Sequence, residues 1–154
     1  MTIPPRMRSI HIDSCAFDPK YDPESKAAEE LHHLDEAGEI HLQIAHSTQK
    51  EIEHPNTPAR VKDQAGVLVF TEETDLTQPE FDLAHRILTI LAGNGRPENV
   101  RQDATHVFEA NKYGWCFVTT DDRILKKRAE IARVCHVRIL KPSECMGMIE
   151  KYRR

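Results

Sequence analysis

The stretch Trp115-Cys116-Phe117-Val118-Thr119-Thr120-Asp121 decides the fold class of this chain. It opens with an unbroken apolar run, which is typical of a strand that is buried on both faces of a parallel sheet. Asp121 then occupies the point where a helix would begin, because aspartate is a favoured N-cap residue. A buried strand that leads directly into a helix predicts a parallel α/β architecture.

Strands and helices alternate on both sides of this stretch. Apolar runs predict strands over residues 10–12, 40–44, 66–70, 115–119 and 137–140. Helical patterns cover residues 24–37, 47–53, 81–91, 98–113, 121–134 and 142–154. This alternation predicts a three-layer α/β/α domain, with a central parallel sheet and helices on both of its faces.

The length of 154 residues fits a single domain that spans 1–154. No stretch approaches the roughly 18 apolar residues of a membrane span, and residues 1–8 lack the apolar core of a secretory signal. We therefore expect a cytoplasmic protein without a membrane partner. The four cysteines have no metal-binding spacing and are interpreted as reduced, mostly buried side chains.

Charge is unevenly distributed along the chain, although the net charge is only −4. Acidic residues dominate positions 18–53 and 72–82, whereas the last third is rich in lysine and arginine. This distribution is typical of a protein in which basic side chains attract a nucleic acid and acidic side chains bind metal cations. The same pattern by itself is equally typical of a solvated helix face.

Acidic residues lie at the ends of predicted strands or near the starts of predicted helices: Asp13, Glu51, Asp103 and Asp121. Asp13 and Asp121 each follow a strand directly. Because the carboxyl ends of parallel strands meet at one edge of the sheet, we expect these acids to converge there. The alternative role for each of them is to cap a helix or to complement its dipole.

Converging carboxylates repel one another and are costly to bury. A bound Mg²⁺ or Mn²⁺ would offset this repulsion, because both cations prefer oxygen ligands. Such a cation polarises a phosphodiester and activates water for attack. The residue types therefore favour metal-assisted phosphoryl chemistry. The nine histidines have no metal-binding spacing and are interpreted as surface or satisfied polar residues.

The order of several short motifs resembles the PIN-domain family. These motifs are Ile10-His11-Ile12-Asp13-Ser14, Lys50-Glu51-Ile52, Asp103-Ala104-Thr105-His106, Phe117-Val118-Thr119-Thr120-Asp121 and Val137-Arg138-Ile139-Leu140-Lys141-Pro142-Ser143-Glu144. Each motif is short, but their order and spacing cover nearly the whole chain.

This resemblance implies a PIN-like fold and a metal-dependent endoribonuclease. The acids that match the family's catalytic cluster are Asp13, Glu51, Asp103 and Asp121. Asp13, Asp103 and Asp121 would bind Mg²⁺ or Mn²⁺, and Glu51 would complete the shell or orient the water. Ser14 and Thr119 would be polar neighbours at the substrate. Many members are toxins of bacterial toxin–antitoxin pairs, so RNA, an antitoxin or other protein partner, and a homodimer are expected.

The sequence departs from the family at two places. The family often has a further acid two residues beyond the one that Asp121 matches, but here Arg123 occupies that position and Asp122 is the extra acid. Residues 55–79 are also longer and more strand-like than the usual helical connection. Arg123 and Lys127 are predicted to contact substrate phosphates, an attraction that salt weakens.

Two other functions compete with the nuclease. The first is a PIN-like module that binds RNA or a protein without cutting. The second is a phosphorelay receiver, which Thr119 and the Leu140-Lys141-Pro142 segment resemble. A receiver needs paired acids after the first strand and an aspartate after the third, whereas Asp13 is followed by Ser14 and the third predicted strand is followed by threonine and glutamate.

Overall fold

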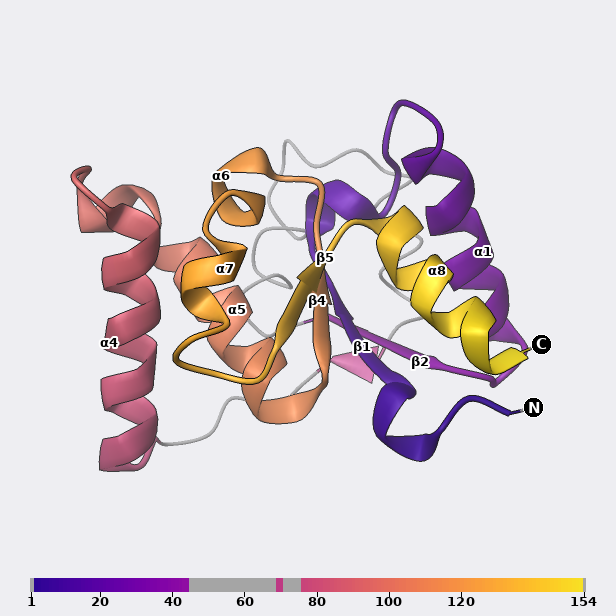
Figure 1. Ribbon diagram of the computed structural model, residues 1–154, viewed down its shortest axis with the longest axis horizontal. Helices are drawn as coiled ribbons and strands as arrows, with labels where there is room; N and C mark the ends of the chain where they lie inside the picture. Colours follow the sequence, from indigo (N-terminus) through magenta and orange to yellow (C-terminus); the bar gives the residue numbers. More distant parts are fainter. Residues whose placement is uncertain (1, 45–68, 71–75, 154) are drawn as a thin grey trace.

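The computed structural model describes residues 2–44, 69–70 and 76–153 of the chain (Figure 1). Its strands are β1 (Ser9–Ile12), β2 (His41–Ile44), β3 (Val69–Phe70), β4 (Cys116–Val118) and β5 (Arg138–Leu140). They form one sheet in the order β3-β2-β1-β4-β5, in which all neighbouring strands are parallel. The parallel sheet confirms the architecture that the sequence predicts.

The α-helices of the described residues are α1 (Glu24–Glu36), α4 (Gln78–Ala92), α5 (Arg101–Tyr113), α6 (Asp122–Leu125), α7 (Arg128–Ile131) and α8 (Pro142–Arg153). Short 3-10 turns, η1 (Pro5–Met7), η2 (Ser14–Ala16) and η3 (Pro97–Asn99), lie before β1, after β1 and before α5. The start of α4 is fixed by a reciprocal cap, in which Thr77 Oγ1 accepts from the Glu80 amide and Glu80 accepts from the Thr77 amide.

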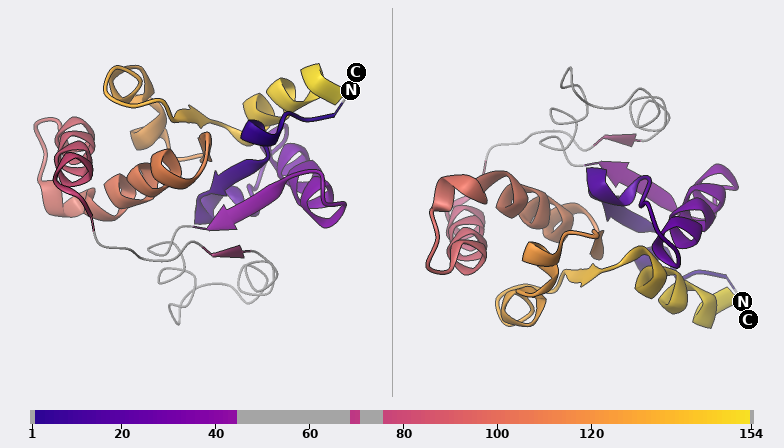
Figure 2. Two further views of the ribbon diagram at one scale, coloured as in Figure 1. Left: turned by 90° about the horizontal axis from the view of Figure 1, so that it is seen from below. Right: turned by 90° about the horizontal axis from the view of Figure 1, so that it is seen from above.

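The helices cover the two faces of the sheet as separate layers (Figures 1 and 2). Helices α1 and α8 pack on one face, against a cluster that includes Ile10 and Ile12. Helices α4 to α7 form the other layer, whose cluster includes Phe117 and Ile139. Because successive strand residues point to opposite faces, one strand such as β4 contributes to both cores.

Two predicted helices differ from those in the structure. Residues 98–113 are split into the 3-10 turn η3 and helix α5, because Val100 has a non-helical backbone (φ −123°, ψ 7°). The single helix predicted over 121–134 is wrong: α6 and α7 are separate short helices, since Lys127 between them lies at φ −100° and ψ 0°. The helix predicted over 47–53 and most of the strand predicted over 66–70 lie outside the described residues.

The strand order reverses between β1 and β4. From β1 the chain moves outward through β2 and β3, and it returns to place β4 on the other side of β1. In open parallel sheets, ligands bind outside the carboxyl ends of the strands where the order reverses in this way. The order also separates this chain from a phosphorelay receiver, because receivers place β1 between β2 and β3.

Candidate functional site

Asp13 follows the carboxyl end of β1, beside the neighbouring strand β4. Its amide donates to the Val118 carbonyl at 2.9 Å, so the ladder between the two strands extends to the acid. Only 5% of Asp13 is exposed. Its carboxylate accepts hydrogen bonds from the Ser14 amide at 2.9 Å, from Thr119 Oγ1 at 2.9 Å and from Cys15 Sγ at 3.3 Å. These donors fix the orientation of the carboxylate.

Thr119 connects the two strand ends. Its fully buried hydroxyl donates to Asp13 Oδ2 and accepts from the Asp121 amide at 3.1 Å. Asp121 in turn is the N-cap of α6, where its Oδ1 accepts from the Arg123 amide at 2.9 Å. A single hydroxyl therefore sets the positions of the acid after β1 and of the backbone that carries the acid after β4.

Asp103, in the first turn of α5, is the third member of an acidic cluster with Asp13 and Asp121. Arg123 binds both neighbouring acids, with its Nη2 atom 2.9 Å from Asp121 Oδ2 and 3.6 Å from Asp103 Oδ2. The Asp103 side chain is 16% exposed, whereas that of Arg123 is 63% exposed. The guanidinium thus closes the outer side of the cluster, while Asp13 lies at its buried end.

The carboxylates interact electrostatically with one another. Burial raises the pKa of Asp13, and the charge of Asp121 raises it further, against the hydrogen bonds that lower it. Burial likewise raises the pKa of Asp103, with further increases from Asp13 and Asp121 and an opposing effect of Arg123. The pKa of Asp121 is lowered, chiefly by its hydrogen bond from Arg123. The structure therefore brings together the three aspartates that the sequence predicts.

The described acids match the chemistry of a hard divalent cation, because they offer carboxylate oxygens whose mutual repulsion a cation would relieve. Among the described residues, however, no group of three or more histidine, cysteine or acidic side chains is placed to hold a metal ion. Arg123 already occupies the space between Asp103 and Asp121. Glu51, the remaining predicted acid, lies outside the described residues. Coordination by all three aspartates would require the guanidinium to move.

Sequence reasoning missed two side chains at this site. His106 is fully buried, and its Nδ1 lies 3.7 Å from Asp13 Oδ1. A signal was present in its spacing, because residues three apart on a helix share a face and Asp103 is three residues earlier. Cys15 is the second: the residue as a whole is exposed, but its sulfur lies against Asp13 and Thr119. Burial and the Asp13 charge raise the pKa of this thiol to about 11, so it is protonated at neutral pH.

The other predicted site residues have different positions. Ser14 follows Asp13 and donates its amide to that carboxylate. Lys127 Nζ lies 3.7 Å from Glu130 Oε1 and close to Gly93 at the end of α4, rather than beside the aspartates. Asp122 is exposed in the first turn of α6. Of the two predicted phosphate contacts, only Arg123 is therefore seen in contact with the acidic cluster.

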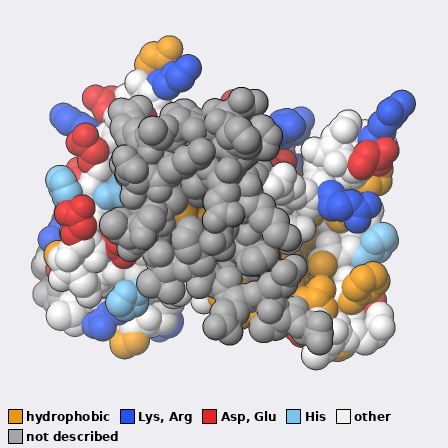
Figure 3. All heavy atoms as spheres, turned by 180° about the vertical axis from the view of Figure 1, so that it is seen from behind, with side chains coloured by type: hydrophobic (Ala, Val, Ile, Leu, Met, Phe, Trp, Pro, Cys, Tyr) orange, Lys and Arg blue, Asp and Glu red, His pale blue; other side chains and the backbone are white. Residues whose placement is uncertain are grey.

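Many basic side chains of the last third pair with acids. The closest nitrogen–oxygen distances are 2.9 Å for Arg123–Asp121, 3.7 Å for Lys127–Glu130, 2.8 Å for Arg128–Glu144 and 3.1 Å for Arg153–Glu150. On the face shown in Figure 3, basic and acidic side chains of the described residues are interspersed. The positive charge of the C-terminal third is therefore partly offset by neighbouring carboxylates.

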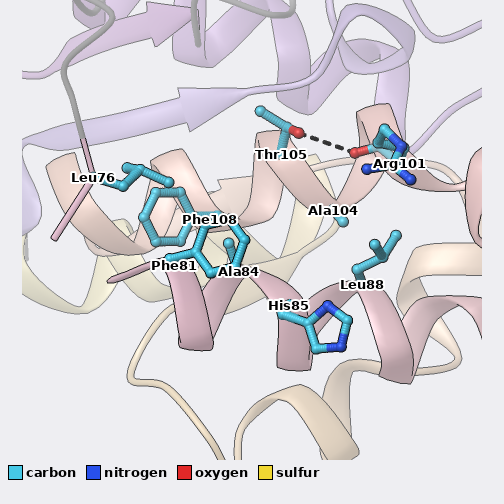
Figure 4. Close-up of a pocket in the computed structure, with 9 residues that line it drawn as sticks. All are labelled: Leu76, Phe81, Ala84, His85, Leu88, Arg101, Ala104, Thr105 and Phe108. Carbon is cyan, nitrogen blue, oxygen red and sulfur yellow. Dashed lines mark hydrogen bonds between the residues drawn. The ribbon is translucent and has the colours of Figure 1, made fainter. Parts of the chain in front are cut away.

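An apolar groove of about 300 Å³ lies between α4 and α5 (Figure 4). Phe81, Leu88 and Phe108 line it, together with Arg101. Phe81 is 60% exposed. None of the three aspartates lines the groove.

Comparison with known proteins does not assign this chain to a family. None of the helices in residues 2–44 and 76–153 is long and apolar enough to cross a membrane. The functional assignment therefore depends on the geometry and chemistry of the acidic site. No protein-family model matches the chain, and no curated protein matches it in sequence.

Proposed function

We propose that this chain is a metal-dependent endoribonuclease of the PIN type. One observation carries the proposal: Asp13, Asp103 and Asp121 converge at the point where the strand order of a parallel sheet reverses. Carboxylates whose proximity raises the pKa of Asp13 and of Asp103 are costly to maintain for stability alone. Active sites are where such arrangements are concentrated.

The cofactor in this proposal is Mg²⁺ or Mn²⁺, held by the three aspartates, with Glu51 as a further candidate ligand. When bound, the cation would supply Lewis-acid polarisation of a phosphodiester and activation of water. The substrate is RNA. The expectations of a homodimer and of an antitoxin or another protein partner belong to the same proposal.

The residues around the cluster have separable roles in this proposal. Thr119 positions Asp13 through its hydroxyl and Asp121 through that residue's amide. Arg123 offsets part of the negative charge of Asp121 and Asp103 in the free protein. Because its side chain is largely exposed, it can turn to a substrate phosphate once a cation has replaced it between the carboxylates.

Cleavage of a mixed RNA pool tests the proposal directly. Wild-type protein is incubated with the pool in Mn²⁺ and in EDTA, in parallel with Asp13→Asn. Asp122→Asn is the matched control, because it removes a neighbouring but exposed carboxylate. We expect cutting that needs the metal, is lost in Asp13→Asn and persists in Asp122→Asn. Cutting by purified Asp13→Asn at the wild-type rate would contradict the proposal.

A specific observation supports a second function, a PIN-like module that binds RNA or a protein without cutting it. Arg123 already pairs with Asp121 and lies 3.6 Å from Asp103, so part of the negative charge of the cluster is offset without a metal. Folded wild-type protein that retains RNA on a filter, but neither cleaves it nor binds Mn²⁺, would establish this second function in place of the nuclease.

A further inference from the structure

A second cavity lies at the edge of the sheet opposite the acidic cluster. It has a volume of about 410 Å³ and is lined by residues next to the amino ends of β4 and β5, by η1 and by α8. The acids lie at the carboxyl ends of β1 and β4, so the two sites are separated by the length of the strands. The cavity is therefore distinct from the proposed catalytic site.

Apart from Tyr152, the ionisable side chains that line this cavity are basic. They are Arg6 from η1, His136 just before β5 and Arg138, the first residue of β5. Lysine, aspartate and glutamate do not line it in the described part of the chain. Neither arginine pairs with an acid of the described residues, in contrast to Arg123 and Arg128. The two arginines therefore line the hollow without a carboxylate of the described residues to offset their charge.

Trp115 also lines the cavity. Its Nε1 atom is enclosed by protein and has no hydrogen-bond partner among the described residues, so it is not one of the groups that face the hollow. Tyr152 of α8 also lines the cavity and contributes a hydroxyl that can donate. The polar side chains that surround the hollow are thus dominated by hydrogen-bond donors.

We propose that this cavity binds a phosphate group. Two guanidinium groups can each donate a pair of parallel hydrogen bonds to phosphate oxygens, a geometry that suits a tetrahedral dianion. The Tyr152 hydroxyl can supply a further donor, and the aromatic side chains of Trp115 and Tyr152 give a surface for an attached group. The ligand can be a nucleoside monophosphate or free inorganic phosphate, and these two sources share the chemistry that the cavity recognises.

Tryptophan fluorescence can report binding at this cavity, because Trp115 is the single tryptophan of the chain. Its fluorescence is titrated with inorganic phosphate, with adenosine monophosphate and with adenosine, at constant pH and ionic strength. We expect saturable changes with the phosphorylated probes and no response to adenosine. Tighter binding of the monophosphate than of inorganic phosphate would identify a nucleotide, and equal binding would identify phosphate itself.

Substitutions test whether the two arginines bind the phosphate group. Arg6→Ala and Arg138→Ala should each weaken binding about tenfold, which corresponds to the loss of one charge-assisted contact. Lys126→Ala is the matched control, since Lys126 is exposed on the loop between α6 and α7. Arg138→Lys keeps the charge but removes the guanidinium, and it replaces Arg138→Ala in this test if the alanine variant does not fold. Asp13→Asn should bind as the wild type does, which separates this proposal from the nuclease.

Two results would overturn the phosphate site. One is the absence of a saturable response of wild-type protein to either phosphorylated probe at millimolar concentration. The other is a response that both arginine variants retain in full while circular dichroism shows them to be folded.

Discussion

Arg123 holds Asp121 through two side-chain hydrogen bonds, from Nη2 to Oδ2 at 2.9 Å and from Nε to Oδ1 at 3.3 Å. The two residues are separated by a single position at the start of α6. A carboxylate that is both an N-cap and one half of a bidentate ion pair has little capacity left for another cation. This ion pair therefore competes with the metal that the proposed nuclease requires.

Removing Arg123 should increase the affinity of the cluster for a divalent cation. Arg123→Ala leaves Asp121 and Asp103 without their common partner, and we expect Mn²⁺ to bind several-fold more tightly because the competing charge is gone. Electron paramagnetic resonance of free Mn²⁺ measures the affinity without RNA. Lys126→Ala should leave it unchanged. Weaker Mn²⁺ binding by Arg123→Ala would show that the arginine does not compete with the cation.

Thr119→Val should destabilise the protein by about 1–3 kcal/mol, because the buried Asp13 carboxylate and the Asp121 amide each lose a hydrogen-bond partner. Urea denaturation measures the change in the free energy of unfolding. Thr119→Ser keeps the hydroxyl and should recover most of the loss. Thr105→Val is a matched control on α5, where the hydroxyl donates only to the Arg101 carbonyl, and its effect should be within about 0.5 kcal/mol.

Gly114→Ala should be destabilising although Gly114 has an ordinary extended backbone. A Cβ atom at this position would lie 2.7 Å from His11 Nδ1 and 3.0 Å from the Ser9 carbonyl oxygen. Because His11 is buried and cannot move away freely, we expect a cost of about 1–3 kcal/mol in chemical denaturation.

Gly147→Ala is the control for this steric argument. Gly147 lies within α8, and a Cβ atom there would meet nothing within 4 Å. Alanine has the higher helix propensity, so this variant should be neutral or up to about 1 kcal/mol more stable. Equal destabilisation by the two substitutions would refute the proposed contact with His11.

The stability of the protein should fall as the pH decreases from 6.5 to 4. Burial lowers the pKa of His11 from 6.5 to about 4, so in this window the unfolded chain binds a proton that the folded protein excludes. The loss attributable to His11 is at most roughly 3 kcal/mol and is complete below pH 4. The midpoint of urea denaturation across this range measures it.

His11→Leu should flatten this pH dependence, because it removes the group that titrates only on unfolding. Part of the slope should remain, since burial also lowers the pKa of His32. A slope of wild-type size in His11→Leu would exclude His11 as its source.

The sequence by itself predicted the parallel α/β architecture and the acidic residues of the candidate site. An unbroken apolar run at β4 and alternation at β1 and β2 specify buried and half-buried strands through local side-chain patterns. The same patterns placed Asp13 and Asp121 directly after strands; in the structure Asp13 follows β1 directly, whereas Asp121 lies three residues beyond the end of β4, as the N-cap of α6. The break at Lys127 was not visible, because lysine is a good helix former and only the packing of α7 against α4 sets the backbone there.

Tertiary structure alone decided which residues meet. The order β3-β2-β1-β4-β5 places Asp13 beside Thr119, and long-range strand pairing of this kind leaves no local signal in a sequence. It also brought His106 to Asp13, turned Arg123 onto two acids and gathered Arg6 and Arg138 around one cavity. Local sequence patterns determine which face of a helix or strand is apolar. The neighbours of a polar side chain depend instead on the order of the strands and on the packing of the helices against the sheet.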